Sequence, residues 1–149
     1  MIDKKKIIYR VISLVALLAV MITIFCLSHE DATESKETSI AVASWFGDLL
    51  GNIPDDVIRT IAHCIEFAAL GFLVYNALYS FKGFISPLIS IGLAFTYSVS
   101  DEIHQYFVPG RAFQLIDLAV DLTGIVIGTL AIFILLKLIT KHKKNCDSK

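Results

Sequence analysis

The sequence predicts an all-α membrane protein: a four-transmembrane-helix bundle with an amphipathic surface helix in the first extracytoplasmic loop. Hydrophobic residues make up 56% of the 149 residues. Charged residues are only 18%, against about 25% in soluble domains. The mean hydropathy is +0.71. Four apolar stretches are each long enough to cross a bilayer core, which takes roughly 20 helical residues.

The same composition excludes several classes of protein. Intrinsic disorder needs low hydrophobicity and high charge, and this chain has neither. A net charge of −1 argues against nucleic acid as a partner. Three scattered cysteines do not form a disulfide framework. We therefore expect one integral membrane domain over residues 1–149.

The four predicted spans follow one another along the chain. Ile7–Leu27 is longer than the apolar core of a cleaved signal and has no small-residue cleavage pattern, so we expect it to be retained. The second span is Thr60–Tyr79. The third, Gly83–Ser100, can continue as a helix to Phe107. The fourth is Leu115–Leu136.

The loop between the first two spans contains the predicted surface helix. Within Ile40–Leu50, apolar residues recur at helical spacing on one face, and Ser44 and Asp48 occupy the other. The segment is too short to span a bilayer. We therefore expect it to lie along the membrane surface, with Trp45 as an anchor.

Lysine and arginine are distributed unevenly between the two ends of the predicted bundle. Ten lie at the termini and in the turn after the second span, and three lie at the opposite end. Cytoplasmic segments are enriched in these residues. We therefore expect a multi-pass protein with both termini in the cytoplasm.

Ionisable residues inside membrane spans are costly and indicate function. Here they gather at the extracytoplasmic ends of three spans. Helical spacing places Arg59, His63 and Glu66 on one face, and Asp117 and Asp121 on another. Acid–base chemistry needs such groups, so the predicted catalytic candidates are Asp101, Glu102, His104, His63 and Glu66. The predicted binding residues are Arg111, Gln105, Asp117, Asp121 and Arg59.

Other roles for these residues stay open at this point. Polar side chains also hold membrane helices together, and the Gly124–Gly128 step permits a close helix contact. His63 and His104 with carboxylates could bind a metal. No known zinc-binding spacing supports that reading, so we predict no metal site. The sequence does not identify a cofactor or an oligomeric state.

These residues resemble the VanZ-like family. The resemblance extends over about residues 10–135. Its motifs are Phe25-Cys26-Leu27-Ser28, Ala62–Phe67 with Leu70-Gly71, the run Ser100–Arg111, and Asp117 and Asp121 before Gly124 and Gly128. Two positions depart from the expected pattern: Phe67 replaces a tyrosine and Asp121 replaces an asparagine.

The resemblance implies a protein of the bacterial cytoplasmic membrane linked to tolerance of teicoplanin-type lipoglycopeptides. Two functions are compatible with it. One is a hydrolase or transferase acting on a lipid-linked envelope substrate, although no known nucleophile motif is present. The other is a non-catalytic binder that shields the antibiotic or its membrane-held target. In both, the expected partner is a membrane lipid or a lipoglycopeptide.

Overall fold

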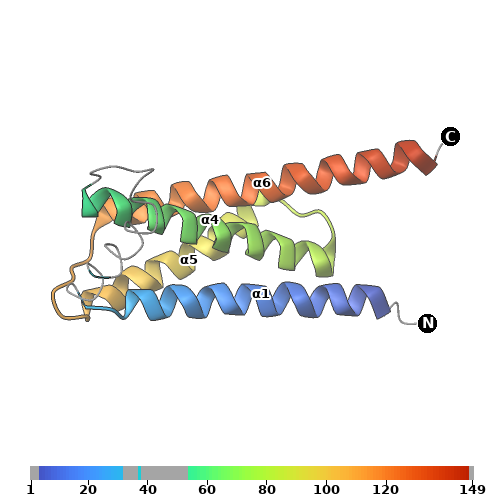
Figure 1. The fold of residues 1–149 in the computed structure, drawn as a ribbon. Helices are drawn as coiled ribbons and strands as arrows, with labels where there is room; N and C mark the ends of the chain where they lie inside the picture. The colour runs from blue at the N-terminus through green and yellow to red at the C-terminus, as the bar shows by residue number, and fades with distance from the viewer. Residues whose placement is uncertain (1–3, 32–36, 38–53, 148–149) are drawn as a thin grey trace.

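The computed structural model describes residues 4–31, 37 and 54–147, and its regular elements are all helices. These helices are α1 (Lys4–Ser28), α4 (Asp55–Lys82), α5 (Pro87–Tyr106) and α6 (Leu115–Asp147). They run alternately up and down, so the two ends of the chain lie at the same end of the bundle (Figure 1). The all-helical prediction is confirmed. The predicted surface helix Ile40–Leu50 lies outside the described residues.

Turn residues set the helix boundaries and correct one prediction. Gly83 ends α4 with a left-handed φ of 76°, and its N–H donates to Tyr79 O at 2.8 Å. The third helix therefore starts at Pro87 rather than Gly83. At its other end the chain turns through Gly110, whose φ is 77°. Both positive angles are accessible to glycine without steric cost.

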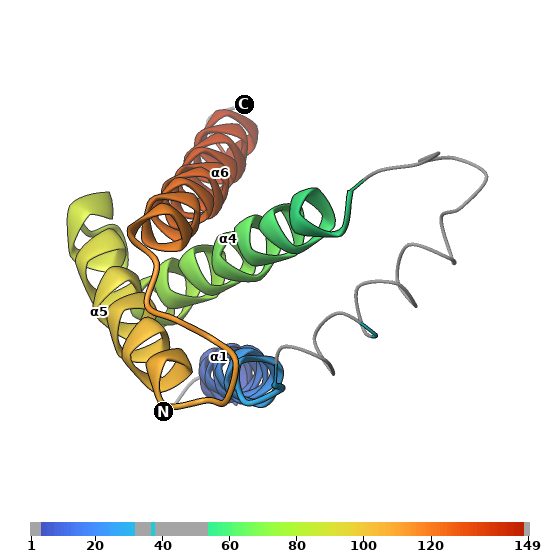
Figure 2. The same ribbon diagram turned by 90° about the vertical axis from the view of Figure 1, so that its left-hand side faces the viewer.

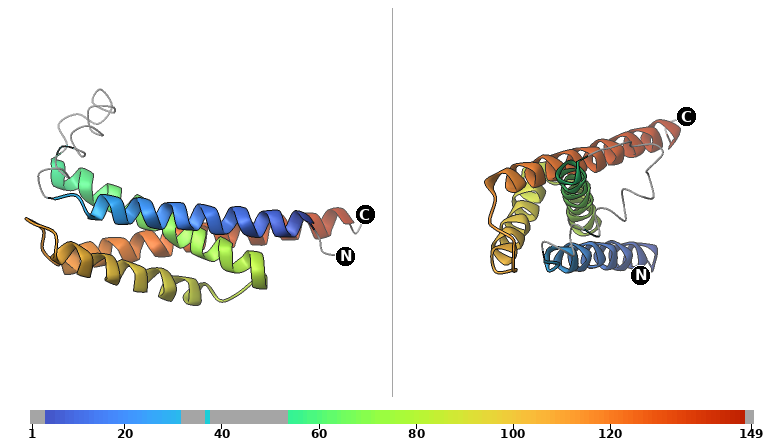
Figure 3. Two further views of the ribbon diagram at one scale, coloured as in Figure 1. Left: turned by 90° about the horizontal axis from the view of Figure 1, so that it is seen from below. Right: turned by 60° about the vertical axis from the view of Figure 1, so that its left-hand side comes forward.

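The central helix of the bundle is α4, which contacts α1, α5 and α6. Viewed from the end, α4 lies between α1 and α6, with α5 alongside (Figures 2 and 3). Phe67, Leu70 and Tyr75 of α4 are fully buried. They form the core with Ile24 of α1 and Ile125 of α6.

Glycine contacts make the α4–α6 pair the closest in the bundle. A Cβ atom at Gly124 would overlap the carbonyl oxygen of Cys64, and one at Gly128 would overlap that of Ala68. Gly71 of α4 meets the α6 backbone in the same way. The Gly124–Gly128 step thus brings a second helix into direct backbone contact, as its spacing predicts.

Many large apolar side chains point outward, as expected of helices surrounded by lipid. Val15, Leu18 and Ile22 of α1 are each more than half exposed. Within the described residues, α1, α4 and α6 are long and apolar enough to cross a membrane. Helix α5 falls outside this set because its last two turns are polar. The fold is therefore that of a membrane protein in which three of the described helices are long and apolar enough to span.

Candidate functional site

Polar side chains collect where α1 and α5 end and α4 and α6 begin, at the end of the bundle opposite the termini (Figure 1). Seven of them are buried, and we call them the helix-end cluster. Its members are Ser28, His63, Ser98, Asp101, Glu102, Gln105 and Asp121. Five of the seven are site residues predicted from the sequence. The other two, Ser28 and Ser98, are not among the predicted site residues.

Asp101 is held by donors from two helices. Its Oδ2 accepts hydrogen bonds from Ser28 Oγ of α1 at 2.8 Å and from Gln105 Nε2 at 3.0 Å. Gln105 Nε2 also lies 3.3 Å from Ser28 Oγ. Asp101 is 4% exposed. Two of the predicted site residues, Asp101 and Gln105, are thus in direct contact, and a third partner, Ser28, comes from α1.

Asp121 joins α4, α5 and α6. Its Oδ2 accepts a hydrogen bond from Ser98 Oγ at 2.8 Å, and its Oδ1 lies 3.4 Å from His63 Nδ1. Both Ser98 and Asp121 are fully buried. The His63 ring stacks on Phe67 at 6.3 Å between centroids. A carboxylate beside Nδ1 leaves Nε2 of the ring to face a ligand, as in general-base histidines.

Arg59 and Asp117 form the more exposed edge of the cluster. Arg59 Nη2 lies 3.5 Å from Asp117 Oδ2, and the two side chains are 39% and 14% exposed. Pairs this accessible contribute about 0.2–1 kcal/mol. Glu66, one turn beyond His63, is half-buried and interacts electrostatically with His63 and Asp101.

Glu102 is hydrogen-bonded to the loop that leads into α6. Its Oε2 accepts a hydrogen bond from the backbone N–H of Gln114 at 2.9 Å, and its side chain is fully buried. Arg111 lies in this loop. Burial lowers the pKa of the Arg111 guanidinium, and the neighbouring Arg59 cation lowers it further. A guanidinium is not deprotonated in proteins, so Arg111 stays charged.

His104 makes different contacts from the other predicted residues. Its ring stacks on Phe25 of α1 with 4.8 Å between centroids. Its Nε2 lies 3.3 Å from His29 Nδ1. His104 and Asp101, three positions apart, share one face of α5, yet Asp101 bonds to Ser28 whereas the His104 ring packs against Phe25 and His29.

The sequence did not predict Ser28, Ser98 or His29 as site residues, and it gave no indication that Ser28 and His29 lie beside these groups. Ser98 had a usable signal, because it shares a helical stripe with Glu102 and Gln105. Ser28 ends the first span and belongs to a motif of the resemblance. Its contact with Asp101 spans 73 positions, and no local pattern shows a contact at that distance.

Four buried polar atoms of the described residues have no hydrogen-bond partner at this end of the bundle. They are His63 Nδ1, Glu102 Oε1, Asp121 Oδ1 and Arg111 Nε. His63 Nδ1 and Asp121 Oδ1 face each other at 3.4 Å, within ion-pair distance, so Glu102 Oε1 and Arg111 Nε are the two for which the described residues offer no partner. Each such atom costs about 1–3 kcal/mol unless something pairs with it. A ligand with hydroxyl or phosphate groups would supply both donors and acceptors. Within the described chain, no group of three His, Cys, Asp or Glu is arranged to hold a metal ion.

Comparison with known families matches residues 13–137 to the VanZ/LLP1 family. No curated protein and no solved structure gives a match. The matched range begins in α1, ends in α6, and contains every residue of the helix-end cluster. The chain therefore belongs to the VanZ-like family.

Proposed function

We propose that this VanZ-like protein acts at the outer leaflet of the bacterial cytoplasmic membrane, where the helix-end cluster binds the polar part of an amphiphile. The ligand class is an envelope lipid or a lipoglycopeptide of the teicoplanin type. The termini lie in the cytoplasm in this proposal, because the lysine-rich end of the bundle is the one that carries them. The whole chain acts as one membrane domain.

The unpartnered buried atoms carry this proposal. Glu102 is fully buried, and its Oε1 has no hydrogen-bond donor. Arg111 leaves a buried Nε without an acceptor. Purely structural polar groups in a membrane bundle satisfy one another. Here an acceptor on Glu102 and a donor on Arg111 both lack partners, so a bound polar group would lower the cost of burying them.

A second candidate function is catalysis on the same ligand. The His63–Asp121 contact at 3.4 Å supports it, because a carboxylate that orients an imidazole is a common device of acid–base catalysis. Arg111 would then hold an anionic headgroup. Turnover separates the two candidates. In the catalytic case His63→Asn abolishes product formation but leaves binding intact, and in the binding case no product forms with the wild type.

Asp101→Asn tests the role of the cluster. The substitution keeps the size of the side chain and removes its charge, while an oxygen remains to accept from Ser28. We expect cells expressing Asp101→Asn to lose teicoplanin tolerance at unchanged protein abundance. The measurement is minimal inhibitory concentration alongside immunoblots of the membrane fraction.

The matched control is Glu37→Gln, which makes the same carboxylate-to-amide change at an exposed position between α1 and α4. This control should leave tolerance unchanged. Wild-type tolerance in Asp101→Asn would show that the cluster does not act on the antibiotic or its target. Loss of abundance in Asp101→Asn, with normal tolerance per molecule, would assign Asp101 to folding alone.

A further inference from the structure

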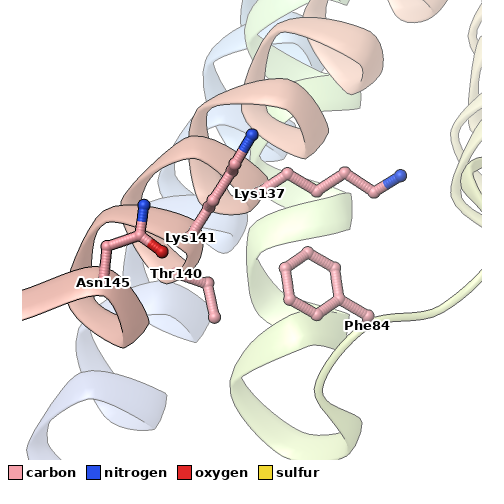
Figure 4. Close-up of a pocket in the computed structure, with 5 residues that line it drawn as sticks. All are labelled: Phe84, Lys137, Thr140, Lys141 and Asn145. Carbon is pink, nitrogen blue, oxygen red and sulfur yellow. The ribbon is translucent and has the colours of Figure 1, made fainter. Parts of the chain in front are cut away.

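A second polar site lies at the opposite end of the bundle from the helix-end cluster. A cavity of about 300 Å³ separates the last part of α6 from the turn after α4 (Figure 4). It is lined by Phe84, Lys137, Thr140, Lys141 and Asn145. We call it the basic pocket. Its volume lies at the lower end of the range of small-molecule pockets, about 300–1,000 Å³.

Two lysines one turn apart supply the charge of the basic pocket. Both arise from α6: the Lys137 side chain runs toward the Phe84 side of the cavity, and the Lys141 side chain points away from Phe84, along α6 (Figure 4). Lys137 Nζ lies 4.3 Å from the centre of the Phe133 ring, and Phe133 meets Phe84 edge-on at 6.3 Å. The aromatic pair holds one ammonium group at the rim by a cation–π contact.

The lysines have no anionic partner within the described side chains. The ion pairs of the described residues join Arg59 to Asp117 and His63 to Asp121, and neither involves Lys137 or Lys141. Thr140 donates its hydroxyl proton to Leu136 O at 2.6 Å, so it offers an acceptor only. Two adjacent positive charges thus face a cavity that contains no negative charge, which favours an anion as the ligand.

The surface below the basic pocket is apolar. Leu130 and Ile134 lie seven residues before Lys137 and Lys141, on the same face of α6. They are 40% and 54% exposed. The apolar stripe of Leu130 and Ile134 therefore leads to Lys137 and Lys141 at the end of the bundle. A free anion would contact only the two lysines, whereas a lipid would contact the lysines with its headgroup and the apolar stripe with an acyl chain.

We propose that the basic pocket binds the phosphodiester headgroup of an anionic phospholipid, with an acyl chain along Leu130 and Ile134. The chemistry that recognises the ligand is the attraction of a phosphate anion to the two lysines that line the pocket. Paired lysines at a membrane edge favour anionic over zwitterionic lipid. The site is independent of the helix-end cluster and of the function proposed for it.

Lipid titration of the purified full chain in detergent, followed by native mass spectrometry, tests this site. The probes are dioleoylphosphatidylglycerol, dioleoylphosphatidylcholine and inorganic phosphate. We expect the wild type to bind the glycerol lipid about tenfold more tightly than the choline lipid. K137Q/K141Q should lose this preference, and K137R/K141R should retain it because both charges remain.

The matched control is K4Q/K6Q, which removes two exposed lysines from the same end of the bundle on α1. It should keep the preference. An equal loss in K4Q/K6Q would show general attraction to positive charge and overturn the site, as would unchanged binding by K137Q/K141Q. Displacement of the lipid by an equal concentration of inorganic phosphate would assign the pocket to a free anion and overturn the lipid assignment.

Discussion

Ser28 and Ser98 each donate a hydroxyl proton to a buried carboxylate on another helix. Ser28 Oγ of α1 donates to Asp101 Oδ2 of α5 at 2.8 Å, and Ser98 Oγ of α5 donates to Asp121 Oδ2 of α6 at 2.8 Å. A hydrogen bond to a charged group is worth about 1.5–3 kcal/mol. The two serines thus link three helices through the carboxylates, and they leave the remaining oxygen of Asp121 directed at His63.

Glu102 offers a test of one buried contact. Glu102→Ala leaves the Gln114 N–H without its acceptor, so we expect a loss of about 2 kcal/mol in the free energy of unfolding. Glu102→Gln keeps an amide oxygen that can accept from Gln114, and we expect a loss below about 1 kcal/mol. Thermal unfolding in detergent measures both. Equal losses would show that the contact with Gln114 is not the stabilising role of Glu102.

At the scale of the helices, the α4–α6 contact decides where the polar groups meet. Gly124 and Gly128 allow α6 to touch the backbone of α4. Asp121 lies three residues before Gly124, and His63 is adjacent to Cys64, which Gly124 contacts. Close helix packing therefore places the imidazole and the carboxylate within 3.4 Å. A wider spacing would separate them.

Gly128→Ala tests this packing. The new methyl group would overlap the carbonyl oxygen of Ala68, and a backbone atom cannot turn aside as a side chain can. We expect a loss of about 2 kcal/mol or more in stability, measured by unfolding in mixed detergent micelles. The matched control is Gly92→Ala in α5, where an added Cβ meets nothing within 4 Å. There the substitution should stabilise the protein by about 0.5–1 kcal/mol through the higher helix propensity of alanine. Similar effects at both positions would contradict a specific α4–α6 contact.

At the scale of the whole molecule, the two ends of the bundle differ in chemistry. The end that carries the termini is rich in lysine and includes the basic pocket. The other end carries the helix-end cluster with its buried acids. Lysine-rich ends face the cytoplasm. This asymmetry gives the proposed orientation, with the cluster at the outer leaflet.

Thiol labelling tests that orientation. In a Cys26→Ser/Cys64→Ser variant the exposed Cys146 near the end of α6 is the remaining thiol of the chain. We expect a membrane-impermeant maleimide to label it only after the cells are opened. Glu37→Cys, made in a chain without other cysteines, should be labelled in intact cells. Labelling of Cys146 in intact cells would reverse the orientation.

The sequence alone was enough to establish the helical class, but not every helix boundary, since α6 continues to Asp147 rather than ending at Leu136. Apolar runs of about 20 residues have few alternatives to a helix in lipid, because every backbone polar group must be paired internally. The Gly124–Gly128 spacing likewise indicated a close helix contact. Local geometry also explains the start of α5. A left-handed Gly83 and a proline at position 87 delay it by four residues relative to the apolar pattern.

The tertiary structure decided which polar groups meet. Asp101 and Gln105 are four positions apart on one helix, so their contact follows from helical geometry. Ser28 lies 73 positions from Asp101, and His63 lies 58 positions from Asp121. These contacts depend on how the helices pack. His104 is an example of a contact that helical spacing did not predict. Its spacing places it on the same face of α5 as Asp101, yet its ring stacks on Phe25 of α1. Residues on one face of a helix can contact side chains of more than one neighbouring helix, and the packing of the helices decides which contacts form.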